Sequence, residues 1–277
     1  MLFASEALAA RIERAECRLL IDGTEAAAAR RGGDDAYVHE LAGGVATFST
    51  PGSPLNKLAG LGFQGPPDAA ELERVEAAFA ARGAPLQVEL STLAEPATGE
   101  LLTQRGYRLV GFENVLGRPL ADVAPTTCAS SIDVTASRAE DADEWIRLVV
   151  DGFAHPDAQG VPSHESFPRE IVTEALKDMA AARGFLRYLA RRDGVSAGGA
   201  SMRLCDGVAQ LCGAATLPEH RRRGVQSALL AARLEHARGE GCDVAVVTTQ
   251  PGSKSHENVQ RQGFELCYSR AVLVLEP

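Results

Sequence analysis

The second half of the chain changes repeatedly between two hydrophobic periods, which predicts alternating helices and strands. Helical spacing of apolar residues marks three segments: 139–154, 169–182 and 225–239. Two Asp-Gly pairs, at 193–194 and 206–207, each lie between strand-like residues and predict a three-stranded antiparallel meander. The apolar run 242–249 is typical of a strand buried on both faces. A short helix over 253–262 and a final strand complete the predicted order.

The first half repeats the end of the second. Segment 102–116, LTQRGYRLVGFENVL, matches segment 259–273, VQRQGFELCYSRAVL, as a helix end, a glycine, an aromatic residue and a strand. Upstream, 71–92 parallels the helix and strand of 225–249 at nearly the same offset. Because two separate blocks agree at one offset, we expect two copies of one α/β unit.

Composition fits this division. A chain of 277 residues with 45% hydrophobic content is long enough for two domains with their own cores. The stretch 117–134 is rich in Pro, Ala, Ser and Thr and interrupts the pattern on both sides. We therefore place a domain boundary near residue 126, with domains at 1–125 and 126–277.

The charge balance excludes several classes of partner. With 37 acidic and 28 basic residues, the net charge is −9, which argues against nucleic-acid and anionic-membrane binding. No apolar run approaches the ~20 residues that cross a bilayer, and the N-terminus lacks the order of a secretory signal, so a cytoplasmic location is expected. The six cysteines form no CxxC pair and no cluster with histidine, which favours reduced thiols and no metal site.

One passage stands out against this acidic background. PEHRRRGVQSALL, at 218–230, places Arg221, Arg222 and Arg223 before Gly224 and a helix. A helix N-terminus offers unpaired N–H groups and partial positive charge, a glycine lets an anion approach, and guanidiniums suit phosphate oxygens. The passage predicts a pyrophosphate site. The alternative is a solvated basic turn that forms salt bridges with the acidic surface.

On these residues the chain resembles the GNAT (Gcn5-related N-acetyltransferase) superfamily, whose acetyl-CoA signature is Gln/Arg-x-x-Gly-x-Gly/Ala. Arg221 and Gly224 fill the first and fourth positions. Gln226 replaces the final small residue, where it either crowds the pyrophosphate or donates its amide to it. The resemblance covers about 131–277, from a first strand to a closing hairpin. It implies a mixed α/β fold of two tandem GNAT-like domains, with a central mixed sheet flanked by helices.

The resemblance also implies roles for particular residues. The backbone of Ala214, Ala215 and Thr216 would bind the pantetheine arm. The pyrophosphate would be held by the loop and helix start: Arg221, Arg222, Arg223, Gly224, Val225, Gln226 and Ser227. On the short helix, Ser253, Ser255 and Asn258 are further candidates, although N-capping explains the serines equally well.

The first copy departs from the signature. No arginine lies between Gly60 and Glu73, where its cofactor loop would fall, so this degenerate copy is not expected to bind coenzyme A.

Acetyl transfer to an amine needs a base for the amine and stabilisation of the leaving thiolate. The family's tyrosine acid is replaced by Val259, which leaves Tyr268 as the candidate acid. The base is either a water chain or a residue of the loop after the first helix of this half: His155, Asp157, His164 or Glu165. No carboxylate is evident on the strands that border the expected cofactor site.

The expected function is therefore an N-acetyltransferase that transfers acetyl from acetyl-CoA directly to a small-molecule primary amine in a ternary complex. Two alternatives stay open, a protein or peptide N-acetyltransferase and a non-catalytic acyl-CoA sensor. The acceptor amine and the oligomeric state are not specified by the sequence.

Overall fold

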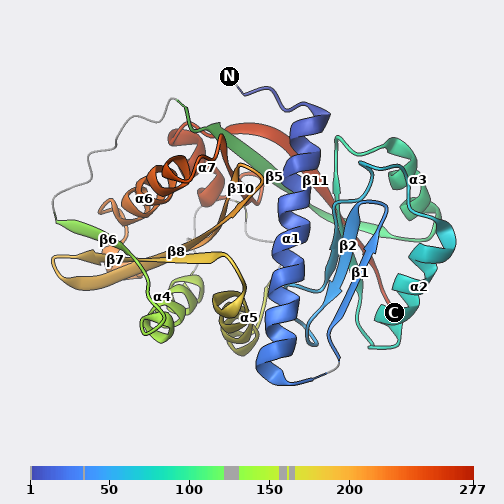
Figure 1. The fold of residues 1–277 in the computed structure, drawn as a ribbon, viewed down its shortest axis with the longest axis horizontal. Coiled ribbons are helices and arrows are strands. Elements are labelled where there is room, and N and C mark those ends of the chain that lie inside the picture. Colours follow the sequence, from blue (N-terminus) through green and yellow to red (C-terminus); the bar gives the residue numbers. More distant parts are fainter. Residues whose placement is uncertain (1, 34, 122–130, 156–160, 162–165) are drawn as a thin grey trace.

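The computed structural model describes residues 2–33, 35–121, 131–155, 161 and 166–277. They form one continuous sheet of eleven strands, in the order β1-β2-β3-β4-β11-β5-β10-β9-β8-β7-β6 (Figure 1). The strands are β1 (Tyr37–Leu41), β2 (Gly44–Phe48), β3 (Lys57–Ala59), β4 (Leu86–Ser91), β5 (Arg108–Pro119), β6 (Ile132–Ala136), β7 (Phe185–Arg192), β8 (Val195–Cys205), β9 (Val208–Thr216), β10 (Val244–Thr249) and β11 (Glu265–Leu275). The helices are α1 (Glu6–Arg31), α2 (Ala69–Ala80), α3 (Pro96–Gln104), α4 (Ala142–Phe153), α5 (Arg169–Ala181), α6 (Val225–Gly239) and α7 (Lys254–Arg261). None of these helices has the length and apolar character needed to span a membrane.

The predicted elements of the second half are confirmed. Strands β7, β8 and β9 form the antiparallel meander, and both Asp-Gly turns have positive φ at their two residues, as a type I′ turn requires. Strand β10 then runs parallel to β9, and α6 and α7 lie on either side of it in sequence. The mixed α/β sheet expected from the resemblance is present.

The closing hairpin expected for the second half is wrong. Strand β11 is a single strand, and both of its neighbours, β4 and β5, come from the first half. Strand β5 in turn lies between β11 and β10, so each half places its last strand beside the buried strand of the other. The predicted boundary near residue 126 lies outside the described residues and stays a prediction.

The centre of this exchange is an ion pair. Glu113 of β5 is the register partner of Arg270 of β11, and the two residues occupy equivalent positions in the repeat. A pseudo-twofold axis therefore passes between them. Their side chains approach to 3.7 Å, and Arg270 Nη1 lies 3.2 Å from a carboxylate oxygen of Glu89.

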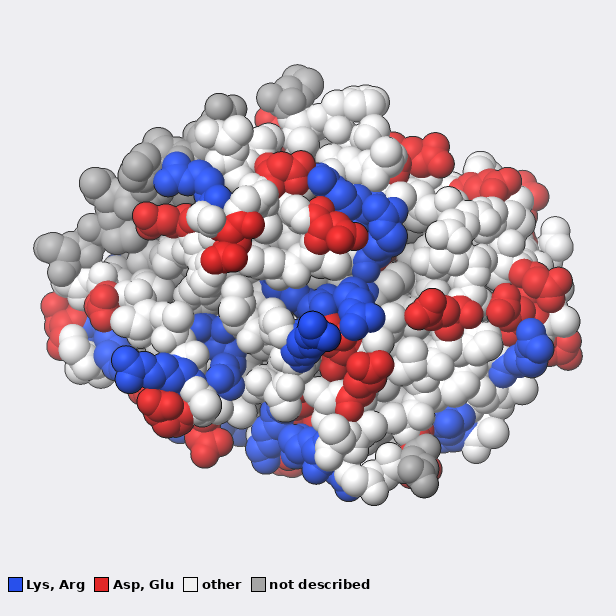
Figure 2. All heavy atoms as spheres, viewed as in Figure 1, with Lys and Arg blue, Asp and Glu red and all other residues white. Residues whose placement is uncertain are grey.

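Helix α1 covers this centre and packs against strands of both halves, including β2 and β9 (Figure 1). Its inward side carries Glu13, which accepts hydrogen bonds from Tyr268 Oη (2.6 Å) and Arg270 Nε (2.8 Å). Its outward side carries Arg14 and Arg18. Figure 2 shows that the positive side chains of this face gather over the middle of the molecule, where α1 runs. Buried acidic side chains thus anchor the helix, and its exposed basic side chains face the solvent.

The buried acids make stability depend on pH. Burial and the neighbouring charge of Glu89 raise the pKa of Glu113 to about 8 from an ordinary 4.5, against the opposing effects of Lys57 and Arg270. Burial also raises the pKa of Glu16. Because the native state holds the Glu113 proton more tightly than the unfolded state, stability falls as pH rises from about 4.5 to about 8.

We expect Glu113→Gln to flatten this dependence, because the amide resembles the protonated acid and cannot ionise. Above pH 8 the variant should be more stable than the parent, on the order of 1–3 kcal/mol. Urea unfolding at pH 5.5 and 8.5 measures both effects. Glu235→Gln, at an exposed position of α6, is the control. Parallel pH profiles for the parent and Glu113→Gln would contradict the assignment.

Candidate functional site

Two parallel strands of the second half separate from each other at one end. Strand β9 pairs with β10 only through Val208–Gln210 and Val244–Val246. Beyond that point a β-bulge leaves Gly213 without a partner in the β8–β9 ladder. A bulge bends its strand and exposes backbone groups that the ladder would otherwise use. The backbone from Leu211 to Thr216 therefore borders an opening in the sheet.

The N-terminus of α6 faces this opening. Gly224 is its N-cap with a φ of 85°, and Arg222 has a φ of 58°. No side chain caps the helix, so N–H groups of its first turn remain for an anion. Helix α6 is fixed in place because one side of it is buried against the sheet.

The equivalent helix of the first half is different. Asp68 is the N-cap of α2, and its carboxylate accepts hydrogen bonds from the N–H groups of Ala70 and Glu71. A fixed carboxylate already occupies the position where an anion would bind. This contrast supports the expectation that the first copy does not bind coenzyme A.

A cavity of about 790 Å³ lies between the separated strands, α6 and α7. Ten of the thirteen predicted cofactor residues line it: Ala214, Thr216, Arg221, Arg222, Gly224, Val225, Gln226, Ser227, Ser255 and Asn258. The other three do not. Ala215 is buried, Arg223 is exposed away from the cavity, and Ser253 caps α7 by accepting a hydrogen bond from the N–H of His256 (3.1 Å).

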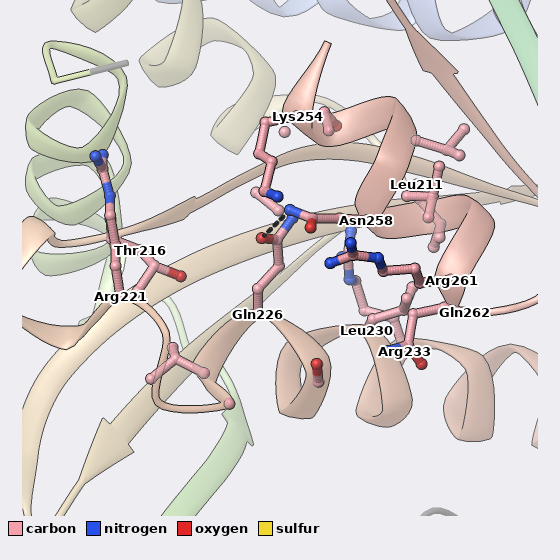
Figure 3. A pocket seen from close by; sticks show the side chains of 18 of the residues that line it. Leu211, Thr216, Arg221, Gln226, Leu230, Arg233, Lys254, Asn258, Arg261 and Gln262 are labelled. Atoms are coloured by element: carbon pink, nitrogen blue, oxygen red, sulfur yellow. Dashed lines mark hydrogen bonds between the residues drawn. The ribbon is translucent and has the colours of Figure 1, made fainter. Parts of the chain in front are cut away.

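Arg221 makes contacts that its sequence position did not reveal. Its Nε donates to the carbonyl of Thr216 (3.2 Å), and its Nη2 donates to the carbonyls of Gly152 (3.3 Å) and His155. In Figure 3 its side chain lies apart from the other labelled cations. The guanidinium thus ties the signature loop to the end of α4, and the loop's N–H groups and Arg222 are left to meet an anion.

Three cations that the sequence analysis missed also line the cavity: Arg233, Lys254 and Arg261. Lys254 and Arg261 both contact Glu257, and with Asn258 they follow the i, i+4, i+7 spacing of one helix face. That spacing was the available signal. No comparable signal marked Arg233, because the other buried positions of α6 are apolar and form no charge pattern with it.

Gln226 bridges the two helices across the cavity. Its Oε1 accepts a hydrogen bond from Asn258 Nδ2 at 3.2 Å (Figure 3). The amide is therefore held at the α7 side of the cavity. Whether it crowds or donates to a bound pyrophosphate stays open, as it was from the sequence.

The cavity has a one-sided charge. Its described lining contains five arginine or lysine residues, which are Arg221, Arg222, Arg233, Lys254 and Arg261. The same lining contains no Asp, Glu or Tyr. In a protein with a net charge of −9, this arrangement favours a polyanion.

The structure does not bring Tyr268 to the cavity. Its hydroxyl donates to Glu13 under α1, and burial raises its pKa far above the ordinary value. Of the loop candidates, His155 contacts the carbonyl of Asp151 through Nδ1 (2.9 Å). The other three, Asp157, His164 and Glu165, lie outside the described residues.

A family of known proteins matches the part of the chain that carries this site. The family model for the GNAT acetyltransferase family matches residues 153–264, which include the opening in the sheet, the signature loop and α7. This part of the second half is similar to the GNAT acetyltransferase family. No curated protein matches the chain.

Solved structures extend the likeness to the whole fold. A GCN5-related N-acetyltransferase from Kribbella flavida has a TM-score of 0.62 and 23% identity, over 91% of this chain and 95% of its own. One from Sphaerobacter thermophilus has a TM-score of 0.54 and 16% identity, over 75% and 67%. A tandem GNAT protein from the clavulanic acid biosynthesis pathway has a TM-score of 0.58 and 14% identity, over 84% and 78%. The GNAT domain therefore sits in a tandem GNAT fold.

Proposed function

We propose that the protein transfers an acetyl group from acetyl-CoA to the primary amine of a small molecule, directly and within a ternary complex. The observation that carries the proposal is the cavity at the uncapped N-terminus of α6. It combines free helix N–H groups, five lining cations and the separated strand β9.

The residues fit the parts of acetyl-CoA in order. The first turn of α6, with Arg222, would hold the pyrophosphate, while Lys254 and Arg261 on α7 add charge for the remaining phosphate. The backbone of Ala214 and Thr216, which pairs with β8 but not with β10, would bind the pantetheine arm on its open side as an added strand does. Acetyl-CoA supplies an activated thioester, and the residues of the protein position this thioester at the opening between β9 and β10.

The sensor alternative has an observation in its favour. The described lining offers no carboxylate as base and no tyrosine as acid. In an acetyltransferase built this way, the acceptor amine must lose its proton to water, to the imidazole of His220, which lines the cavity, or to a group beyond the described lining.

A different observation favours the peptide alternative. Strand β10 pairs only with residues 114–119 of β5, so the edge of 108–113 has no strand partner on that side. Leu109 and Phe112 are about half exposed there. An open edge with apolar side chains can bind an extended chain by strand addition.

An amine panel with release of the coenzyme A thiol as readout tests the three functions. We expect release with small primary amines and intersecting initial-rate plots, because both substrates must be bound before transfer. Release with peptides alone would replace the proposal by the peptide alternative. Acetyl-CoA binding without release by any amine would replace it by the sensor.

A further inference from the structure

Arg233 is a buried charge without a counter-charge. It is 4% exposed, yet it lines the cavity from the third turn of α6. Among the described residues, no carboxylate forms an ion pair with it. Burial lowers its pKa to about 10, so it still carries its positive charge at neutral pH. Burying an unpaired charge is costly and calls for an anionic partner.

Backbone carbonyls fix the position of this guanidinium. Nε donates to the carbonyl of Leu229 (3.1 Å), and Nη1 donates to the carbonyls of Ser201 (3.0 Å) and Cys212 (3.4 Å). The last two belong to the β-bulge at which β9 leaves its regular ladder. No described residue hydrogen-bonds Nη2, and this atom is not among the buried unpaired ones. It therefore remains available to a bound group.

The neighbouring thiol does not supply the missing charge. Burial raises the pKa of Cys212 to about 12, so this side chain is neutral at the pH at which Arg233 is charged. The partner must come from a ligand.

The helix also sets the distance to the phosphate site. From Gly224 to the backbone of Arg233 the rise along α6 is about 13.5 Å, and the bulge that Arg233 contacts lies on β9, the strand that leads into the signature loop. The sulfur of a coenzyme A bound at the helix N-terminus would thus reach the bulge where Arg233 is held.

We infer that Arg233 stabilises the thiolate of coenzyme A as it leaves, in place of an acid that would protonate it. The inference rests on the proposed function. In the step itself the amine nitrogen forms a bond to the carbonyl carbon and the carbon–sulfur bond breaks. The electron pair stays on sulfur as a thiolate beside the guanidinium, and the amine proton goes to water. Arg233 keeps its own protons throughout.

The test titrates the thiol of coenzyme A bound to the protein, by the ultraviolet absorbance of the thiolate. The complex with desulfo-coenzyme A is the blank. In the parent we expect a thiol pKa at least about one unit below that of free coenzyme A. Arg233→Met should raise the pKa to the free value or above, and Arg233→Lys should keep part of the lowering. Arg238→Met, on the exposed side of the same helix, should titrate like the parent.

Kinetics give a second readout. We expect Arg233→Met to lower kcat about 10- to 100-fold with little change in the affinity for acetyl-CoA, and Arg233→Lys to recover part of the loss. A parent complex in which the thiol titrates as in free coenzyme A would overturn the inference, whether or not the variants fold. Failure of the parent to bind coenzyme A at all would instead refute the proposed function.

Discussion

Expressed by itself, segment 126–277 is expected not to reach its native fold. Without the first half, β10 loses its neighbour β5, and β11 loses both β4 and β5. Unpaired strands in the middle of a sheet expose backbone groups and apolar side chains to water. Arg270 would also lose Glu13, Glu16, Glu89 and Glu113, whose carboxylates lie 2.8–3.7 Å from its guanidinium.

Co-expression of 1–125 and 126–277 as separate chains should restore folding, because the exchanged strands are the interface. We expect the two chains to co-purify and to unfold in one cooperative transition, as followed by circular dichroism. Segment 126–277 alone should give no such transition. A stable, cooperatively folded 126–277 that binds acetyl-CoA like the whole chain would contradict this account of the fold.

Gly224→Ala is expected to remove most of the stabilisation that acetyl-CoA gives the protein. Gly224 has a φ of 85°, a left-handed conformation that a side chain strains by about 1–2 kcal/mol. The loop would relax and turn its N–H groups away from the anion. We expect at least a 10-fold loss of acetyl-CoA affinity, measured by calorimetry and as a smaller thermal shift at equal ligand concentration.

Gly241→Ala supplies the matched control. Gly241 has a φ of 78° just beyond the other end of α6, and a Cβ there would meet no atom within 4 Å. Both variants should lose similar stability without ligand. Only Gly224→Ala should lose affinity for acetyl-CoA. Equal affinity in the two variants would mean that the loop at Gly224 does not bind the pyrophosphate.

Local chemistry explains why the sequence predicted the second half well. The Asp-Gly pairs define the hairpins, Gly224 ends the arginine run in a left-handed conformation, and the apolar run of β10 marks a buried strand. These signals act within a few residues. They also explain why ten of the thirteen proposed cofactor residues line one cavity.

The contacts of three residues that the sequence did not reveal involve partners distant in sequence. Tyr268 was assigned as an acid, yet its hydroxyl bonds to Glu13, which lies 255 positions away. Arg221 lines the cavity as predicted, but the sequence did not reveal that its guanidinium also donates to the end of α4. Arg233 is the one charged residue among the buried positions of α6 and gave no signal, because its contacts are carbonyls of β8 and β9.

The sequence by itself determined the order of helices and strands in the second half and the glycine turn before α6, since propensity, periodicity and glycine conformation are local properties. Only the tertiary structure decided that the last strands of the two halves are exchanged, that the side chains of Glu113 and Arg270 meet near the axis, and that five cations line one cavity. The reason is that strand pairing and charge pairing depend on which residues the fold of the whole chain brings into contact. Equivalent strands of a repeat carry nearly the same pattern, so the pattern cannot say which of them pair.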